Sequence, residues 1–221
     1  MRLVTLTAAA VLVLPFMILA DIGPYNAQGE KAGEVDSHSA ILMTRLTAAP
    51  VRDSLGYVSG AAGWVSFELS LYDDFSRASF TPWRDALVRN DFIVKVEVDG
   101  LSADTRWFYR AHIGTAPGRT VRVGERRSFR TAPEPLELSD VSAVITCCNV
   151  YNTLDHPEGY DSYAAMTRLR PDFVVTTGDN VYYDRDSPPG VDLESCRLHW
   201  QRMYSLPRLV EFFGGGLPVT G

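Results

Sequence analysis

Hydrophobic and polar residues alternate along three segments in the first half of the chain, at residues 64–71, 92–99 and 106–113. In the first of them, Val65, Phe67, Leu69 and Leu71 share one face, and serine and glutamate side chains share the other. Short segments of period two, separated by turns such as Asp99-Gly100, are typical of a β-sandwich. We therefore predict an all-β region from about residue 33 to residue 132.

The pattern changes after a proline-rich break at Thr131-Ala-Pro-Glu-Pro135. Residues 141–146 and 172–177 are β-branched apolar runs that indicate two buried strands, and residues 160–170 between them have helical spacing and end before Pro171. Strand, helix and strand in so short a stretch predict a right-handed βαβ unit with two parallel strands. A further helix is predicted at 193–206, before Pro207. The parallel strands are expected to have apolar faces exposed on both sides.

The net charge and the N-terminal residues indicate which partners are disfavoured and where the protein resides. The chain has 221 residues, 46% of them hydrophobic, and a net charge of −6, which argues against a broad nucleic-acid-binding surface. Residues 1–20 begin with Met1-Arg2 and continue as an apolar run that contains Pro15 and ends in Ala20. We interpret this run as a cleaved export signal, with an uncleaved membrane anchor as the alternative, and predict an exported protein with no other membrane segment. The oligomeric state cannot be read from the sequence.

Candidate chemistry lies where the two predicted parallel strands end. The first ends at Cys147-Cys148 and the second at Gly178-Asp179, with Tyr182 three residues further on. Because ligands of open α/β sheets bind at the carboxyl ends of strands, we expect a thiol, a carboxylate and a phenol to meet there. A phenol coordinates well as phenolate, which favours ferric iron, and a carboxylate can bridge two ions. We therefore predict a metal site built on Asp179 and Tyr182. The residues alone leave open which cysteine joins them, because Cys147 and Cys148 face opposite ways along the strand, and by themselves they favour a structural role for the cysteines.

Other polar residues have simpler interpretations. Cys147 or Cys148 could instead form a disulfide with Cys196, because export permits disulfides. The acidic residues of the loop at 184–190 are expected to be solvated. The four histidines, at positions 38, 112, 156 and 199, are interpreted as surface or packing residues, and the pair Asp155-His156 as a surface turn.

The order of these features resembles the PhoD-like alkaline phosphatases, which are exported phosphomonoesterases and phosphodiesterases of the metallophosphoesterase superfamily. The resemblance rests on the motif Thr146-Cys-Cys-Asn149 and on residues 170–183, Arg-Pro-Asp-Phe-Val-Val-Thr-Thr-Gly-Asp-Asn-Val-Tyr-Tyr. It extends to Trp200-Gln-Arg-Met-Tyr-Ser-Leu-Pro207, and residues 101–107 are similar to a segment of fibronectin type III domains. It implies a fold that is mixed β and α/β, with a fibronectin type III-like β-sandwich followed by an incomplete metallophosphoesterase domain. The implied segments are a signal at 1–20, the sandwich at 21–132, a linker at 133–137 and the truncated phosphatase domain at 138–221.

The resemblance also implies roles for the three rim residues. Cys148, Asp179 and Tyr182 would be metal ligands: Cys148 and Tyr182 would bind iron(III), and Asp179, which would also be catalytic, would bridge iron and calcium, although other divalent metals remain open. The substrate would be a small phosphoester, attacked by a metal-activated hydroxide at a dinuclear centre.

This sequence also departs from the family's pattern. It lacks the family's twin-arginine signal, and the remaining ligands, which begin with an Asp-Asp-His segment after the third strand, would follow Leu217-Pro-Val-Thr-Gly221. We therefore expect these 221 residues to be the N-terminal part of a longer enzyme and inactive alone. The alternative function is an exported β-sandwich binding module with a vestigial α/β tail.

Overall fold

The structure is a computed structural model that describes residues 23–215 and 219–220. The predicted signal at 1–20 therefore lies outside the described residues. The elements in chain order are β1 (Glu30–Gly33), β2 (Ser39–Arg45), β3 (Gly63–Ser70), β4 (Ser79–Phe80), β5 (Arg84–Ala86), η1 (Val88–Asn90), β6 (Ile93–Asp99), β7 (Arg106–Ala116), β8 (Arg119–Val123), β9 (Arg127–Arg130), β10 (Ala143–Thr146), η2 (Tyr151–Thr153), α1 (Asp161–Leu169), β11 (Phe173–Thr176), α2 (Leu193–Met203), α3 (Pro207–Gly214) and β12 (Val219–Thr220).

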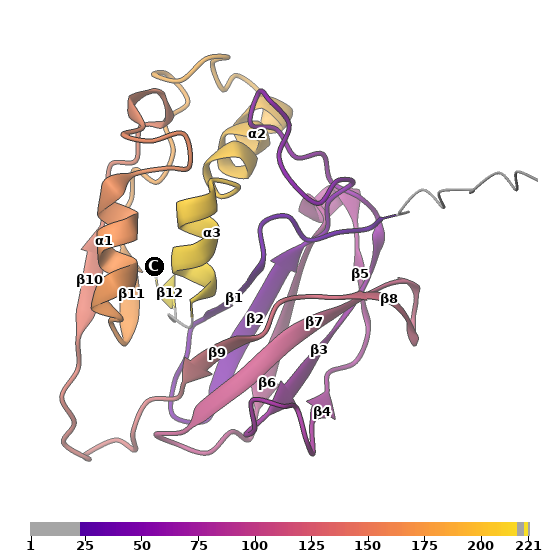
Figure 1. The fold of residues 1–221 in the computed structure, drawn as a ribbon, viewed down its shortest axis with the longest axis vertical. Coiled ribbons are helices and arrows are strands. Elements are labelled where there is room, and N and C mark those ends of the chain that lie inside the picture. Colours follow the sequence, from indigo (N-terminus) through magenta and orange to yellow (C-terminus); the bar gives the residue numbers. More distant parts are fainter. Residues whose placement is uncertain (1–22, 216–218, 221) are drawn as a thin grey trace, which may run out of the picture.

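The β region is a sandwich of two sheets (Figure 1). One sheet has the order β4-β3-β7-β8, with β5 and β9 paired to β3 and β7, and the other contains the antiparallel strands β1, β2 and β6. The alternating residues predicted from the sequence fill the core between the sheets, where Phe67, Tyr109 and Phe129 are fully buried. Leu71 is an exception: it lies beyond the end of β3 and is 47% exposed. The mixed β and α/β fold class is confirmed.

One of the two sheets continues into the α/β region. Its six strands have the order β10-β11-β12-β1-β2-β6. Strands β10 and β11 are parallel, as the βαβ pattern predicts, and β12 is parallel to β11. Val219 of β12 pairs with Val174 on one side and with Gly33 of β1 on the other. Strand β12 thus joins the parallel strands to the sandwich through backbone hydrogen bonds.

The parallel strands are covered on one face. Helices α1 and α3 pack on the face that carries Val174, and together they bury Tyr163, Leu209 and Phe212 (Figure 1). On the opposite face, Ile145 is 70% exposed. The expectation of two exposed faces was thus wrong for one of them, because a second helix, α3, follows directly after α2.

Proline explains where this second helix begins. The sequence predicted one helix that ends before Pro207, whereas α2 ends at Met203 and Pro207 is the first residue of α3. Proline suits the first position of a helix because its missing N–H group would have no partner there. Asp192 begins α2 by accepting a hydrogen bond from the Ser195 amide at 2.8 Å, which forms a capping box.

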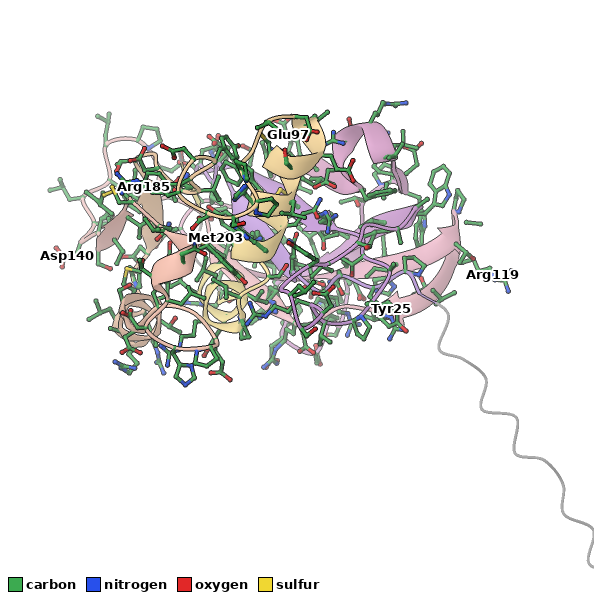
Figure 2. All side chains as sticks on the ribbon, turned by 90° about the horizontal axis from the view of Figure 1, so that it is seen from above. Tyr25, Glu97, Arg119, Asp140, Arg185 and Met203 are labelled. Atoms are coloured by element: carbon green, nitrogen blue, oxygen red, sulfur yellow. The ribbon has the colours of Figure 1, made fainter. Side chains whose placement is uncertain are left out.

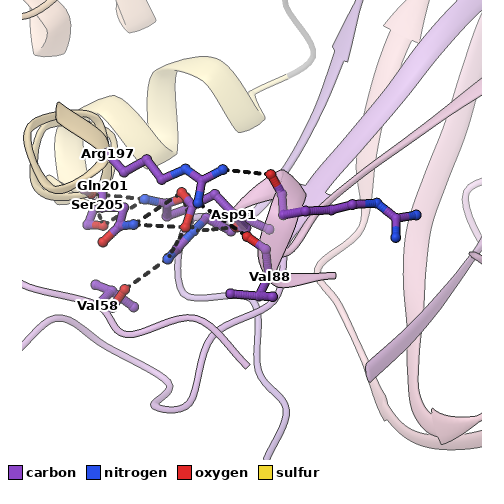
Figure 3. Close-up of polar contacts among 9 residues, drawn as sticks. Val58, Val88, Asp91, Arg197, Gln201 and Ser205 are labelled. Atoms are coloured by element: carbon purple, nitrogen blue, oxygen red, sulfur yellow. Dashed lines mark hydrogen bonds and ion pairs between the residues drawn. The ribbon is translucent and has the colours of Figure 1, made fainter. Parts of the chain in front are cut away.

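Helix α2 is anchored to the sandwich by polar contacts (Figure 3). Gln201 donates to the carboxylate of Asp91 at 2.9 Å, and the buried guanidinium of Arg45 binds the same carboxylate at 3.1 Å. Gln28, which precedes β1, donates to the Gln201 carbonyl at 2.9 Å. Arg197 of α2 donates to the carbonyls of η1. These contacts hold α2 over the outer face of β1, β2 and β6. No helix among residues 23–215 is long and apolar enough to cross a membrane.

Candidate metal centre

The candidate site lies where β10 and β11 end side by side. The two strands pair in register from Ala143 with Phe173 to Thr146 with Thr176, so the residues that follow them reach the same edge of the sheet. Cys148 and Asp179 both have positive φ angles, of 60° and 53°. Left-handed backbone costs about 1–2 kcal/mol for a residue with a Cβ atom and is concentrated at functional sites. The local chain is thus bent at both residues, in the conformation that brings them together.

The three predicted ligands meet at one carboxylate oxygen. Oδ2 of Asp179 accepts a hydrogen bond from the Tyr182 hydroxyl at 2.7 Å, and the thiol of Cys148 lies 3.7 Å from the same oxygen. Cys148 and Asp179 are exposed and Tyr182 is partly exposed, so the cluster is open to solvent. Among the described residues, Oδ1 of Asp179 has no hydrogen-bond partner. The structure therefore brings together Cys148, Asp179 and Tyr182.

The protonation of the cluster follows from its contacts. The hydrogen bond to Asp179, followed by the one to Cys148, raises the pKa of the Tyr182 phenol well above its ordinary value. Contact with Cys148 likewise raises the pKa of the neighbouring Cys147 thiol. Without a cation the phenol is protonated, because a phenolate beside this carboxylate would place two negative charges in contact.

The two oxygen donors suit a hard, strongly acidic cation, and the thiol adds a softer donor. Carboxylate, phenol and thiol converge within hydrogen-bonding distance of one point, and each binds metals in its deprotonated form. Within the part of the chain that the structure describes, no group of three or more His, Cys, Asp and Glu side chains could hold a metal ion, so a three-donor site at this edge would need the Tyr182 phenol.

Two loops hold these donors in place, and one acidic residue joins the loops. The amide of Asn149 donates to the Asp179 carbonyl at 2.9 Å. Further along, the carboxylate of Asp186 accepts from the amides of Tyr151 and Asn152 at 3.1 and 3.0 Å. Asp186 is 3% exposed, so the expectation that the acids of this loop are solvated was wrong for it. Nothing in the sequence indicated that Asp186 is buried, because it lies in a loop rich in proline and serine, where polar residues are usually exposed.

A buried basic pair lies behind Asp186. The guanidinium of Arg202 lies 3.9 Å from the Asp186 carboxylate and donates to the Ser187 carbonyl at 2.6 Å. Arg202 also contacts Nδ1 of His199 at 3.0 Å, and since arginine only donates, Nδ1 accepts and the His199 Nε2–H group donates to the Pro188 carbonyl at 2.8 Å. Burial and the charge of Arg202 lower the pKa of His199, which is therefore neutral.

The remaining candidates lie elsewhere. His38 pairs with Glu134 at 3.1 Å, and His112 contacts Glu68 at 2.8 Å, both in the sandwich. His156 lies in an exposed turn, as predicted. Cys147, Cys148 and Cys196 are all free thiols, so the alternative disulfide does not form.

The fold and this edge define a class of protein: a β-sandwich that shares a sheet with a parallel α/β unit, which presents a thiol, a carboxylate and a phenol at its carboxyl end. The family model of the PhoD-like phosphatase N-terminal domain matches residues 23–133. The chain belongs to this family. A search of the curated proteins found no match.

Solved structures extend the similarity beyond the sandwich. The structure of PhoD aligns with a TM-score of 0.67 and 20% identity over 89% of this chain. The chain spans 38% of the length of that PhoD structure, and at this identity the likeness shows a common fold. The sensor domain of the anti-sigma factor RsgI4 of Pseudobacteroides cellulosolvens aligns with a TM-score of 0.36 and 9% identity, over 52% of this chain and 98% of its own. A human fibronectin type III domain aligns with a TM-score of 0.36 and 8% identity, over 51% of this chain and 77% of its own.

Proposed function

We propose that Cys148, Asp179 and Tyr182 form part of the metal centre of a PhoD-like phosphoester hydrolase. The observation that carries this proposal is the meeting of the three side chains at Oδ2 of Asp179, at 2.7 Å from the phenol and 3.7 Å from the thiol. They come from two loops about 30 residues apart in sequence, at the edge where α/β sheets bind ligands.

The donors divide naturally between two ions. Cys148 and Tyr182 would hold iron(III), and Asp179 would bridge it to calcium or another divalent ion. The unpartnered Oδ1 of Asp179 supports this assignment, because Oδ2 alone already faces the thiol and the phenol. When bound, the two ions would lower the pKa of water and neutralise charge on the phosphoryl oxygens.

The chain's own residues prepare the site for those ions. The hydrogen bond that Tyr182 donates to Asp179 orients the phenol, whose proton would have to be released when a metal binds. The amide of Asn149 fixes the backbone of Asp179 relative to the loop of Cys148. Arg185, whose guanidinium lies 4.9 Å from the centre of the Tyr182 ring, packs on the outer side of the phenol.

The activity proposed for the family member is hydrolysis of a small phosphoester outside the cytoplasm. The proposed export rests on the apolar run at residues 1–20. We expect little turnover from residues 21–221 alone, since calcium takes six to eight oxygen ligands and three donors serve both ions. The proposal favours an enzyme over a β-sandwich binding module, and the support is the single sheet that runs through both regions.

The test is iron binding to the chain from Asp21 to Gly221, followed by metal analysis and visible spectroscopy. We expect bound iron with a tyrosinate charge-transfer band, and loss of that band in Tyr182→Phe. Tyr183→Phe is the matched control, because the Tyr183 hydroxyl instead accepts from the Trp200 indole at 2.7 Å.

Two further variants complete the design. Asp179→Asn should release the metal, whereas Cys147→Ser should retain it. Iron binding without a tyrosinate band, or a band that survives in Tyr182→Phe, would show that the phenol is not a ligand.

A further inference from the structure

A cavity of about 380 Å³ lies between α2 and the outer face of the sandwich sheet. Strands β1, β2 and β6 form its floor, and Trp200, Gln201 and Tyr204 form one wall. Thr176 and Asn180 line it as well, so the cavity reaches the carboxyl end of β11, next to Asp179. Its volume is in the range of small-molecule binding pockets.

Both lysines of the chain line this cavity. Of 21 basic residues only Lys31 and Lys95 are lysines, and the strand register places them in one row, since Lys31 pairs with Met43 and Met43 pairs with Lys95. Paired residues in a sheet point to the same face, so two ammonium groups flank Met43 on the floor. Two strand spacings separate their backbones by about 10 Å.

Neither ammonium group has a carboxylate within salt-bridge distance among the described residues. The other charged pair in the cavity, Arg45 and Asp91, is neutralised internally at 3.1 Å, which leaves Glu34 at the edge as the remaining acid. Burial, followed by the charge of Arg127, lowers the pKa of Lys31 to about 8. The chain therefore bears a cost for keeping this ammonium group without an anionic partner.

The wall opposite the lysines is aromatic. Trp200 lies on α2 and Tyr204 one turn further on, directly after the helix ends, and their rings stack at 5.6 Å with an angle of 8° between their planes. The Lys31 ammonium lies 5.1 Å from the centre of the Tyr204 ring. Apolar atoms of Ile41 and Met43 complete the surface. The cavity thus offers a positive end and an apolar, aromatic side.

We propose that this cavity binds a small organic phosphate. Its phosphate group would bind to Lys31 and Lys95, and its apolar or planar group would pack against Met43 and Tyr204. Two ammonium groups in one row favour a dianion over a single carboxylate, and the apolar wall favours an ester over inorganic phosphate. The identification of this ligand with the hydrolysed phosphoester, or with its product, rests on the proposed function.

Binding can be measured by NMR of the two lysine side chains. Metal-free protein from Asp21 to Gly221, labelled with ¹³C at the lysine Cε atoms, gives two resonances, assigned with Lys31→Gln and Lys95→Gln. Phenyl phosphate is the probe, and phenol and inorganic phosphate are its two halves. We expect phenyl phosphate to shift both resonances and to bind at least about tenfold more tightly than either half, the effect of one good charged hydrogen bond.

Variants locate the binding site. Lys31→Gln should weaken phenyl phosphate binding by about tenfold or more. Arg119→Gln is the charge-matched control: Arg119 lies at the end of the molecule far from Arg185, and its loss should leave binding unchanged (Figure 2). Equal weakening in both variants would reduce the effect to net charge and overturn the proposal.

Other outcomes also decide the matter. Unshifted lysine resonances at millimolar phenyl phosphate, or equal affinity for phenol, would refute the anion site. Equal affinity for inorganic phosphate would refute the apolar site. Because the protein is metal-free, these results are independent of iron binding at Tyr182, and either proposal can fail without the other.

Discussion

Asp186 should be among the most important polar residues for stability in the α/β region. Its carboxylate is almost fully buried and accepts two backbone N–H groups, from Tyr151 and Asn152, with Arg202 at 3.9 Å. Asp186→Ala removes all three partners at once. The loop after β10 then loses the two amide hydrogen bonds that attach it to Asp186 in the loop after β11.

The magnitude follows from these contacts. A hydrogen bond to a charged group is worth about 1.5–3 kcal/mol, and removal of one partner of a buried ion pair costs about 3–5 kcal/mol. The terms overlap, because the same carboxylate serves both, so we expect a loss of about 3–5 kcal/mol in the free energy of unfolding. For a chain of this size that loss lowers the Tm by roughly 10 °C.

Chemical denaturation of the wild type and the variant measures this loss. Asp184→Ala is the control, since Asp184 is exposed two residues earlier in the same loop, and it should change stability by less than about 0.5 kcal/mol. Hydrogen exchange at the Tyr151 and Asn152 amides should accelerate in Asp186→Ala alone. Equal stability of Asp186→Ala and Asp184→Ala would refute the reasoning. It would mean that the buried carboxylate of Asp186 stabilises the fold no more than the exposed carboxylate of Asp184.

Three other predictions concern charge and surface. Burial lowers the pKa of Lys31 to about 8, below its value in the unfolded chain. The free energy of unfolding of the wild type should therefore rise relative to that of Lys31→Met as pH rises from about 8 to 10.5. An unchanged difference between the two proteins over this pH range would contradict the prediction. The pKa of His199, which faces Arg202 and Asp186, is lowered. In denaturant titrations the free energy of unfolding of the wild type should therefore fall relative to that of His199→Asn as pH drops below about 6.5. A difference between the two proteins that does not change with pH would contradict the neutral state of His199. Ile145→Thr should reduce concentration-dependent association in light scattering, because Ile145 is 70% exposed on the uncovered sheet face; unchanged association would place the contact elsewhere.

The sequence predicted the elements well where local periodicity and strand order decide the structure. Alternation placed Val94, Val96 and Val98 in the sandwich core, where they are buried. The βαβ pattern predicted that β10 and β11 are parallel, and parallel strands end at one edge, so the meeting of Cys148 and Asp179 followed. The roles of these residues as metal ligands stay predictions.

Contacts between distant parts of the chain were not predictable in this way. The pairing of Gly33 with Val219 makes one sheet of the two regions, and it joins residues 186 positions apart. The same holds for Asp186, which looks like an ordinary polar loop residue until the loop after β10 folds over it.

The sequence by itself thus determined which residues form strands and helices, because side-chain period and proline position act over a few neighbouring residues. The tertiary structure alone decided that Lys31 and Lys95 share a cavity, since their common face depends on the register of β1, β2 and β6. Register and burial arise from packing between segments far apart in the chain, and a one-residue shift in strand pairing would have sent each lysine to the opposite face.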